Sequence, residues 1–259
     1  MKPLTRQLLN LSQLCLRWQL LLNQGLTVAD LLVQGYKVSS YSMELDEWKV
    51  FVGNCATICT IIQFLVGIQV CAGFYRNKTT GETSCMTFLV GVVMTFVWFN
   101  YGKLVGDTTL QTVNGTGLVL QILYTFCFYN FTPVKIQTGK KIFLTLIVVI
   151  LVQVYIYNEI ILETAQFRIG MVGASMSIAY CSAPLASIQH VFRTRSTESL
   201  PFYLIMATVV VTGLWSLYGH IIHDSFVKIP NMIGFSAALF QFSLFYYFPN
   251  KTYKDQGII

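Results

Sequence analysis

The chain has 259 residues, of which 54% are hydrophobic, 14% aromatic and only 11% charged, and its formal net charge is +6. Soluble domains carry about a quarter charged residues, so this composition excludes an ordinary soluble protein and favours a membrane protein. The basic residues lie singly between apolar runs and form no stripe or arm, which excludes a nucleic acid as partner.

The first 45 residues are rich in leucine, but Arg17 and Asp30 interrupt the apolar pattern. A signal peptide is one interpretation, although no clean small-residue cleavage site follows. An amphipathic helix at the membrane interface fits better. A third interpretation starts the functional chain near Met43. We therefore treat residues 1–45 as a leader of unknown role.

Seven apolar stretches follow, each long enough for the about 20 residues that a helix needs to cross a bilayer. They lie at 50–74, 86–104, 111–132, 142–162, 168–191, 202–221 and 227–248. The connections are short and carry charges and turn-forming residues, so no soluble domain fits between the stretches. A short polar tail, residues 250–259, comes last. The sequence predicts an all-α membrane protein with seven transmembrane helices.

The first three spans and the last three share residues at a constant spacing of 117 positions. The matched pairs are Gly67 and Pro184, Lys78 and Arg195, Trp98 and Trp215, Tyr101-Gly102 and Tyr218-Gly219, Asp107 and Asp224, and Asn114 and Asn231. Functional groups in register over about 50 residues indicate an internal duplication. The two copies define triple-helix bundles at 46–132 and 168–249. The fourth span, within 133–167, is left as a linker helix.

The single linker helix decides how the two copies are oriented. Three crossings leave the chain on the opposite side of the membrane, and a fourth crossing returns it to the starting side. The second copy therefore enters the membrane in the same direction as the first. The expected architecture is a 3+1+3 parallel repeat about an axis along the membrane normal.

Matched aromatic and amide residues lie at one depth in the two copies. Trp98 lies four residues before Gly102, where the second span ends, and Asn114 follows the start of the third span by about four residues. With a rise of about 1.5 Å per residue, both lie at least about 6 Å inside the same end of the bundle. Trp215 and Asn231 repeat this placement. We expect two indoles and two amides around a central cavity.

The basic residues favour one orientation of the chain. If the first connection is cytosolic, nine cations lie in the cytosol and four lie outside. The leader adds four cations to the outside, so the bias becomes nine against eight if the leader is retained. We expect the N-terminus outside and the C-terminus in the cytosol. The plasma membrane is the expected location, and the Golgi or another internal membrane is the alternative.

The seven cysteines point to no metal or redox site. Their number is odd, most lie within apolar stretches, and no pair has the CxxC spacing. We interpret them as buried free thiols. The histidines lie in connections or at span ends and form no metal-ligand set, and no nucleophile–base–acid set indicates an enzyme. We expect no cofactor.

Longer strings in both halves resemble one family. The first half contains "WFNYG" and "TVNGTG", and the second contains "SAPLASIQHVFRTRSTESLPF" and "WSLYGHIIHDSFVKIPN". Over residues 50–250 the chain resembles the SWEET (MtN3/saliva) sugar transporters, particularly the animal and insect members. SWEET transporters are a known case of parallel repeats. The resemblance implies paired triple-helix bundles, facilitated diffusion of mono- or disaccharides by alternating access, and homo-oligomeric assembly.

The resemblance also implies a sugar site. Asn114 and Asn231 match pocket asparagines that bind sugar hydroxyls, and Trp215 matches the pocket tryptophan of the second bundle. Trp98 stands where plant members often have a smaller residue, which implies a narrower pocket with two aromatic faces. Indoles can cover the apolar faces of a pyranose while amides donate to and accept from its hydroxyls. The alternatives are that the amides join helices and that the indoles anchor at the interface.

The extracellular gate is the second implied feature. Tyr101 and Asp224 match residues that close this side in the family, and we place Tyr218 with them as the repeat partner of Tyr101. The alternative is that these residues, with Asp107, form a simple outer rim.

The intracellular gate departs from the family pattern. Pro184 and Pro201 match two of four prolines that allow helices to bend there. Their first-bundle counterparts are Gly67 and Thr87. Glycine can still act as a hinge, whereas threonine departs from the pattern, so symmetric gating does not follow from the resemblance.

Other functions are less consistent with the sequence. A PQ-loop-type amino-acid or cystine transporter shares the fold, but no PQ dipeptide and no mid-span carboxylate for proton coupling occur. A seven-helix receptor would not contain a 117-residue duplication, and strings resembling DRY or NPxxY are missing. A trafficking role on the same scaffold stays open. We predict a uniporter that moves mono- or disaccharides down their gradient.

Overall fold

The predicted apolar stretches form helices, because a chain in lipid must satisfy its backbone hydrogen bonds within each segment. The computed structural model describes residues 28–248 except 183, 198 and 199, and it describes side chains from Leu45 onward, outside 182–187 and 190. The helices are α2 (Val28–Asn77), α3 (Met86–Val105), α4 (Thr108–Phe131), α5 (Lys135–Asn158), α6 (Leu162–Ser182), α7 (Pro184–Thr194), α8 (Phe202–Ile221) and α9 (Ser225–Tyr247). The described ranges contain no strand, which confirms the all-α prediction.

The chain divides into two units, residues 1–48 and 49–259. The second unit is the membrane domain, and all contacts below lie within it. Helix α2 begins at Val28, so the sequence-predicted boundary at residue 45 falls inside a helix. Residues 1–27 of the predicted leader and the tail lie outside the described part.

Four described segments are long and apolar enough to cross a membrane by length and composition alone. They are Leu45–Asn77 of α2 and the helices α3, α5 and α8. Helices α4 and α9 have 24 and 23 residues, which is sufficient length. They also contain the amides Asn114 and Asn231, which lower their apolar character.

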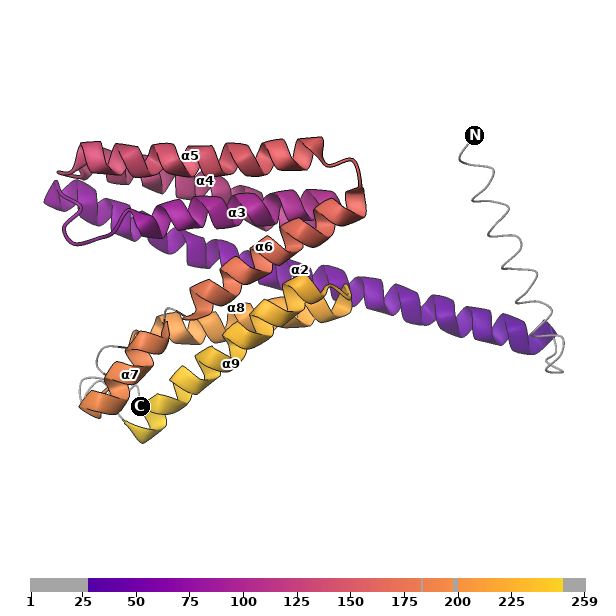
Figure 1. Cartoon of the computed structure of the whole chain (residues 1–259). Coiled ribbons are helices and arrows are strands. Elements are labelled where there is room, and N and C mark those ends of the chain that lie inside the picture. The colour runs from indigo at the N-terminus through magenta and orange to yellow at the C-terminus, as the bar shows by residue number, and fades with distance from the viewer. Residues whose placement is uncertain (1–27, 183, 198–199, 249–259) are drawn as a thin grey trace. The chain divides into compact units, whose positions relative to one another are not determined.

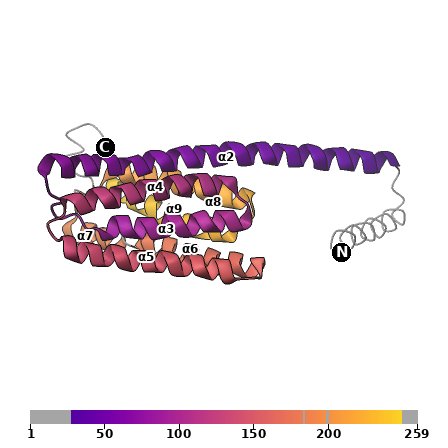
Figure 2. The ribbon, with the colours of Figure 1, turned by 90° about the horizontal axis from the view of Figure 1, so that it is seen from above.

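The third helix of each bundle packs against both of the others. In the first bundle α4 lies between α2 and α3 (Figure 2), and in the second α9 packs on α6 and α8. The Tyr124 hydroxyl of α4 donates to the carbonyl oxygen of Phe64 in α2 at 3.0 Å. On another face of α4, the Gln121 amide lies over Gly91 of α3, where a Cβ atom would come within 2.6 Å of it.

The linker helix α5 lies beside α3 and α4 of the first bundle (Figure 1). Most of its apolar side chains are exposed, as expected for a helix that faces lipid. It begins at Lys135, seven residues before the predicted start at 142. Hydropathy marks only the apolar part of a span, whereas the helix continues into the polar interface.

The fifth predicted span, 168–191, is two helices. Helix α6 ends at Ser182 and α7 begins at Pro184. Proline disfavours helical conformation in the residue before it and is tolerated as the first residue of a helix. The corresponding helix of the first bundle, α2, is continuous through Gly67.

The turns α3–α4 and α8–α9 have the same backbone conformation. Gly106, with φ 74°, and His223, with φ 55°, both adopt the left-handed conformation. These two residues are 117 positions apart, so the duplication includes the turn geometry. Glycine adopts this conformation at no steric cost, whereas histidine does so with some strain.

Each turn is closed by the residue that starts the next helix. The Asp107 N–H donates to the carbonyl of Gly102, and the Asp224 N–H donates to that of Gly219, both at 2.9 Å. This pattern is the Schellman motif, which satisfies carbonyls at the end of a helix. We call the end of the domain that carries Asp107 and Asp224 the aspartate end.

Buried apolar residues form three clusters. The largest, the shared cluster, contains residues from both bundles: Val52, Ala56, Val97, Trp98, Tyr101, Leu110, Val113, Ile169, Val211, Trp215, Tyr218 and Val227. The second belongs to the first bundle: Phe74, Cys85, Phe88, Leu89, Tyr124 and Phe128. The third belongs to the second bundle: Ile188, Val191, Leu200, Ile205, Leu244 and Phe245. Among these clusters of described residues, the shared cluster, toward the aspartate end, is the one that joins the two bundles.

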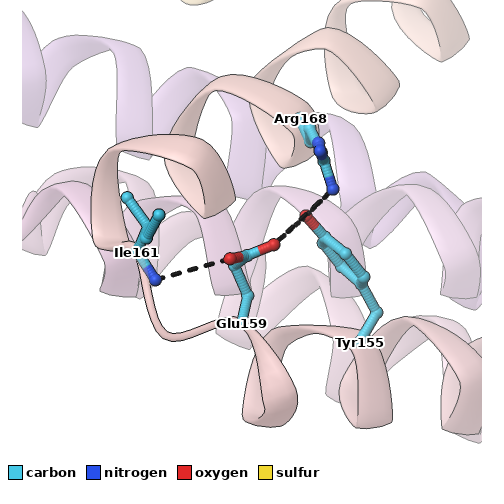
Figure 3. A network of polar contacts seen from close by, with 4 residues as sticks. All are labelled: Tyr155, Glu159, Ile161 and Arg168. Atoms are coloured by element: carbon cyan, nitrogen blue, oxygen red, sulfur yellow. Dashed lines mark hydrogen bonds and ion pairs between the residues drawn. The ribbon is translucent and has the colours of Figure 1, made fainter.

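The linker helix is tied to the second bundle where α5 meets α6. Figure 3 shows Glu159 accepting from the Ile161 N–H at 3.4 Å and from the Tyr155 hydroxyl at 3.2 Å. The Arg168 guanidinium donates to the same hydroxyl at 3.2 Å and forms an ion pair with Glu159 at 3.5 Å. Since α5 also packs on the first bundle, this network connects α6 to α5 and, through α5, to the first bundle.

Candidate functional site

Two tyrosines at the aspartate end bond to aspartates of the opposite bundle. The Tyr101 hydroxyl of α3 donates to Asp224 Oδ2 at 2.6 Å. The Tyr218 hydroxyl of α8 donates to Asp107 Oδ2 at 2.7 Å. Tyr101 is 3% exposed and Tyr218 is fully buried. The two bonds cross the bundle boundary in opposite directions, so each bundle supplies one tyrosine and one aspartate at this end.

The same aspartates start helices α4 and α9. Asp107 Oδ1 accepts from the Leu110 N–H at 2.9 Å. Asp224 Oδ1 accepts from the Phe226 and Val227 N–H groups at 2.8 and 3.3 Å. A carboxylate at a helix N-terminus is stabilised by these donors and by the helix dipole. One oxygen therefore fixes each carboxylate on its own helix, and the other receives the tyrosine.

The two tryptophans also bond across the bundle boundary. Trp215 Nε1 donates to Thr60 Oγ1 of α2 at 2.9 Å, and Trp98 Nε1 donates to Ser177 Oγ of α6 at 3.2 Å. Thr60 and Ser177 are themselves 177 − 60 = 117 residues apart. Each indole also contacts the tyrosine one turn along edge to face, with centroid distances of 5.4 Å for Trp98 and 5.5 Å for Trp215.

The two amides of the predicted sugar site bond to their own helices. Asn114 Nδ2 donates to the Leu110 carbonyl at 2.9 Å, and Asn231 Nδ2 donates to the Val227 carbonyl at 2.8 Å. Among the described residues, neither Oδ1 atom has a partner, and no hydrogen bond joins an amide to an indole. Each amide thus keeps one acceptor and one donor for a ligand.

Small residues on the first helix of each bundle admit these aromatic rings. A Cβ at Gly53 would lie 2.9 Å from Tyr218, and a Cβ at Gly170 would lie 2.9 Å from Tyr101 and 2.6 Å from Phe226. Such distances are shorter than atoms tolerate, so the rings pack against the bare backbone. Glycine at these two positions allows the two bundles to approach closely.

The predicted intracellular gate residues lie at the opposite end and differ between the bundles. A Cβ at Gly67 would lie 2.3 Å from the Tyr124 ring, so this glycine packs closely against α4. Pro201 is the N-cap of α8, and the N-cap of α3 is Cys85. Thr87 therefore lies two residues further along than the structural counterpart of Pro201. The side chain of Pro184 lies outside the described set.

The amides and indoles of the site are neutral, and the charged side chains among the described site residues are the aspartates. Within the described ranges, no group of three histidine, cysteine, aspartate or glutamate residues could hold a metal ion. The arrangement offers aromatic faces, amide donors and acceptors, and hydroxyls, which suit a neutral polyol better than an ion.

A family model described as "Sugar efflux transporter for intercellular exchange" matches residues 50–136 and again 167–253. The second match begins 167 − 50 = 117 residues after the first, so it reproduces the spacing of the duplication. The chain belongs to the SWEET (MtN3/saliva) family. This family consists of sugar transporters and not of enzymes.

Individual SWEET proteins resemble the chain over most of its length. Sugar transporter SWEET1 of Drosophila pseudoobscura pseudoobscura is 33% identical over 205 residues, covering 78% of this chain and 90% of that protein. Sugar transporter SWEET1 of Mus musculus is 28% identical over 216 residues, covering 81% and 95%. Bidirectional sugar transporter SWEET16 of Oryza sativa subsp. japonica is 28% identical over 215 residues, covering 80% and 64%.

A solved structure of a eukaryotic SWEET transporter has the same fold. Its TM-score with this chain is 0.72 at 24% identity, covering 79% of this chain and 98% of that one. The predicted seven-helix 3+1+3 architecture is thereby confirmed, with α6 and α7 together forming the fifth span.

Three polar residues of the aspartate end were absent from the sequence-predicted site. The 117-residue spacing pairs Asp107 with Asp224, but the sequence-predicted gate contains only Asp224 of the two. Thr60 and Ser177 lie outside the sequence-predicted site. The 117-residue spacing pairs these two hydroxyl residues in the first helix of each bundle. Hydroxyl residues are common in membrane helices, so this match alone does not mark them as part of the site.

Proposed function

We propose that this SWEET protein is a uniporter that moves mono- or disaccharides down their gradient by alternating access. The observation that carries the proposal is the repeated set of one indole and one amide on each side of the bundle boundary. Trp98 with Asn114 and Trp215 with Asn231 would bind the sugar. The two relatives named SWEET1 are sugar transporters, and the rice relative is named a bidirectional one.

The sugar would be held by stacking and by hydrogen bonds. Pyranose C–H faces stack on indoles, and hydroxyls need both donors and acceptors. The free Oδ1 and N–H of Asn114 and Asn231 supply these. Sugar hydroxyls without partners in an apolar site would cost several kcal/mol, so a site without these amides would bind weakly.

Alternating access would use the two ends in turn. The crossed tyrosine–aspartate bonds of Tyr101 and Tyr218 would form the closed gate at the aspartate end. The other two apolar clusters each lie within one bundle, which supports an opposite end that can open. At that end Gly67, Thr87, Pro184 and Pro201 would allow the helices to bend.

Transport would need no proton. In the described part of the membrane domain, Asp107 and Asp224 are helix N-caps, Glu159 lies at a helix end, Glu163 lies in the first turn of α6 and Glu82 lies in a connection. None lies beside the amides, so the binding step has no titrating group there. Flux would follow the sugar gradient in either direction.

The decisive experiment measures uptake of labelled D-glucose, D-fructose, D-galactose and sucrose in cells that lack their own transporters, with and without a protonophore. We expect uptake of at least one sugar that equilibrates and responds weakly to the protonophore. Accumulation above the external concentration that the protonophore abolishes would contradict uniport. Failure to carry any sugar would contradict the proposed substrate class.

The expected surroundings are a plasma membrane, with the aspartate end outside, and a homo-oligomer. The excess of cytosolic cations supports this orientation. An epitope tag placed after Ile259 should bind antibody only in permeabilised cells, and labelling of intact cells would reverse the orientation. Light scattering of the protein purified in detergent would test the homo-oligomer, and a monomer mass would exclude it.

A further inference from the structure

The N–H groups of the two pocket indoles have their partners on the opposite bundle. An indole donates one hydrogen bond and accepts none. Trp98 and Trp215 are 8% and 7% exposed, so water can reach them little. Their partners, Ser177 and Thr60, are therefore what satisfies these buried donors.

The Thr60 hydroxyl is held as an acceptor. It donates its own proton to the Ala56 carbonyl at 2.7 Å, which leaves its lone pairs for Trp215 at 2.9 Å. Ser177 differs, because no acceptor for its hydroxyl proton occurs among the described residues. Its bond to Trp98 is also longer, at 3.2 Å. The Trp215 indole is thus held by a more firmly oriented acceptor than the Trp98 indole.

The other polar groups near this depth form no hydrogen bond with the indoles among the described residues. The amides of Asn114 and Asn231 donate to carbonyls of their own helices. The hydroxyls of Tyr101 and Tyr218 donate to the gate aspartates. The indole–hydroxyl bonds are therefore a second pair of crossed bonds, one helical turn deeper than the tyrosine–aspartate pair.

Separation of the two bundles at the aspartate end would break both of these bonds, because one joins α8 to α2 and the other joins α3 to α6. Each indole N–H then loses its protein acceptor. A sugar hydroxyl already bound at the site replaces that acceptor while the end opens, whereas in the empty carrier only water that enters with opening can do so.

We propose that Thr60 and Ser177 are positioning residues that hold the two indoles across the bundle boundary in the sugar-free carrier, and that a bound sugar takes over the indole N–H groups when the aspartate end opens. This proposal rests on the transport function proposed above. It assigns no sugar contact to either hydroxyl. The hydroxyls act through the tryptophans.

The proposal makes a specific statement about rates. The empty carrier reopens slowly because it loses two hydrogen bonds, whereas the loaded carrier replaces them. Exchange of sugar for sugar is therefore faster than net flux into sugar-free vesicles. Removal of a hydroxyl should speed the empty step and lower the ratio of exchange to net flux.

The first experiment compares Thr60→Val, Ser177→Ala and the conservative Thr60→Ser in proteoliposomes, with D-glucose and sucrose as probes. Thr60→Val should lower the exchange-to-net ratio by about two- to tenfold, and Ser177→Ala by less, because its bond is longer. Thr60→Ser should keep the wild-type ratio. Thr145→Val is the matched control, because Thr145 also donates to a carbonyl four residues back, but through an exposed hydrogen bond on α5.

The half-saturating sugar concentration separates this role from two others. Loss of a positioning hydroxyl removes a competitor for the indole, so the concentration should fall. If the hydroxyl were instead a sugar ligand, its loss would raise the half-saturating concentration. If it were only a structural contact, its loss would lower protein yield but leave the exchange-to-net ratio unchanged. A raised half-saturating concentration, or an unchanged exchange-to-net ratio, in both Thr60→Val and Ser177→Ala overturns the proposal.

A second measurement needs no transport. In a chain with Trp18, Trp48 and Trp98 replaced by phenylalanine, Trp215 is the only tryptophan, and excitation near its red edge avoids the tyrosines. Thr60→Val should increase acrylamide quenching of its emission in the sugar-free protein, and Thr60→Ser should not. Unchanged quenching overturns the positioning role. Because this readout needs no sugar, it stands even if no sugar in the panel is carried and the proposed function fails.

Discussion

The two triple-helix bundles are alike in their turns and differ inside their helices. The left-handed residue after the first helix of each bundle is Lys78, with φ 55°, or Arg195, with φ 54°. Each of these cations lies over an aromatic ring at the end of the third helix, Phe131 at 6.0 Å or Phe248 at 5.6 Å. These pairs also follow the 117-residue spacing, so the turns at both ends of the bundles are repeated.

The helix interiors do not repeat in this way. Helix α9 contains the fully buried Pro230 next to Asn231, whereas α4 has Val113 at the matching position. A proline removes one backbone donor and bends a helix. A crossed contact forms only when both copies supply the matching residue. The packing inside one bundle depends on that bundle alone, so the two copies can differ there. The comparison therefore predicts equal effects of mutation at the two crossed tyrosine–aspartate bonds, whose lengths match, and unequal effects inside the helices.

The largest effects are expected at the pocket. Asn231→Ala removes the free donor and acceptor and should raise the half-saturating sugar concentration by roughly 5- to 150-fold, about 1–3 kcal/mol. Asn114→Ala should act similarly. Trp215→Ala should do at least as much, whereas Trp98→Ala should widen the pocket toward larger sugars. Concentration-dependent uptake, normalised to protein in the membrane, measures each effect.

Cys127→Ala in α4 serves as the control for this series, because Cys127 packs within the first-bundle cluster. It should change uptake little. If both asparagine variants transport like the wild type, the amides only join helices and the sugar binds elsewhere.

At the gate, Tyr101→Phe and Tyr218→Phe should have equal effects. Each variant removes one hydroxyl from a carboxylate, and the two bonds measure 2.6 and 2.7 Å. We expect each to shift the population toward an open aspartate end by about tenfold. Spin labels at the matched exposed positions Thr108 and Ser225, in a cysteine-free chain, report the separation of the bundles. An effect of only one variant would show that the gate is not symmetric.

Glycine substitutions should push the two bundles apart less than the tyrosine variants do. The effects at the two matched glycines should also differ in size. Gly170→Ala places a methyl group against both Phe226 and Tyr101, whereas Gly53→Ala meets Tyr218 and the Thr109 side chain at longer distances. Overpacking costs typically 1–3 kcal/mol, and relaxation of the rings should reduce this to about a fivefold shift for Gly170→Ala.

The same spin-label distance measures the glycine variants. Gly73→Ala is the matched control in α2, because a Cβ there meets nothing within 4 Å. It should leave the distance unchanged. A larger shift for Gly53→Ala than for Gly170→Ala would contradict the packing argument.

The smallest effect is expected where the second bundle has a contact without a repeat partner. Arg168→Gln breaks the ion pair with Glu159, but the Arg168 side chain is 59% exposed, so solvent screens the charge. We expect a loss of about 0.2–1 kcal/mol in stability, measured by thermal unfolding in detergent. A double-mutant cycle with Glu159→Gln should give a coupling within this range. A much larger coupling would mean that the junction in Figure 3 controls how the bundles pack.

The sequence predicted the fold well because its signals are strong and local. Apolar length gave the spans, and the 117-residue spacing gave the two bundles and the linker. The division of the fifth span at Pro184 was not predicted, since a proline within an apolar run only bends many membrane helices. The start of α2 at Val28 was not predicted either, because leucine-rich polar segments fit several structures.

The site was predicted in part. The spacing identified the matched indoles, amides, tyrosines and aspartates, but it did not show that donors and acceptors pair across the bundle boundary. A repeat shows that Tyr101 corresponds to Tyr218 and Asp107 to Asp224. It cannot show that Tyr101 bonds to Asp224, because that pairing depends on how the two bundles meet.

The crossed pairing bears on how a duplicated gene can change. Tyr101 in one copy needs Asp224 in the other, and Trp98 needs Ser177. A substitution in either copy therefore weakens a bond that the other copy also depends on, and the two copies cannot drift apart at these positions. Within one bundle, as at Pro230, a change affects only its own copy. Several of the residues that match at the 117-residue spacing are thus residues that bond across the bundle boundary, where neither half of the gene could change without affecting the other.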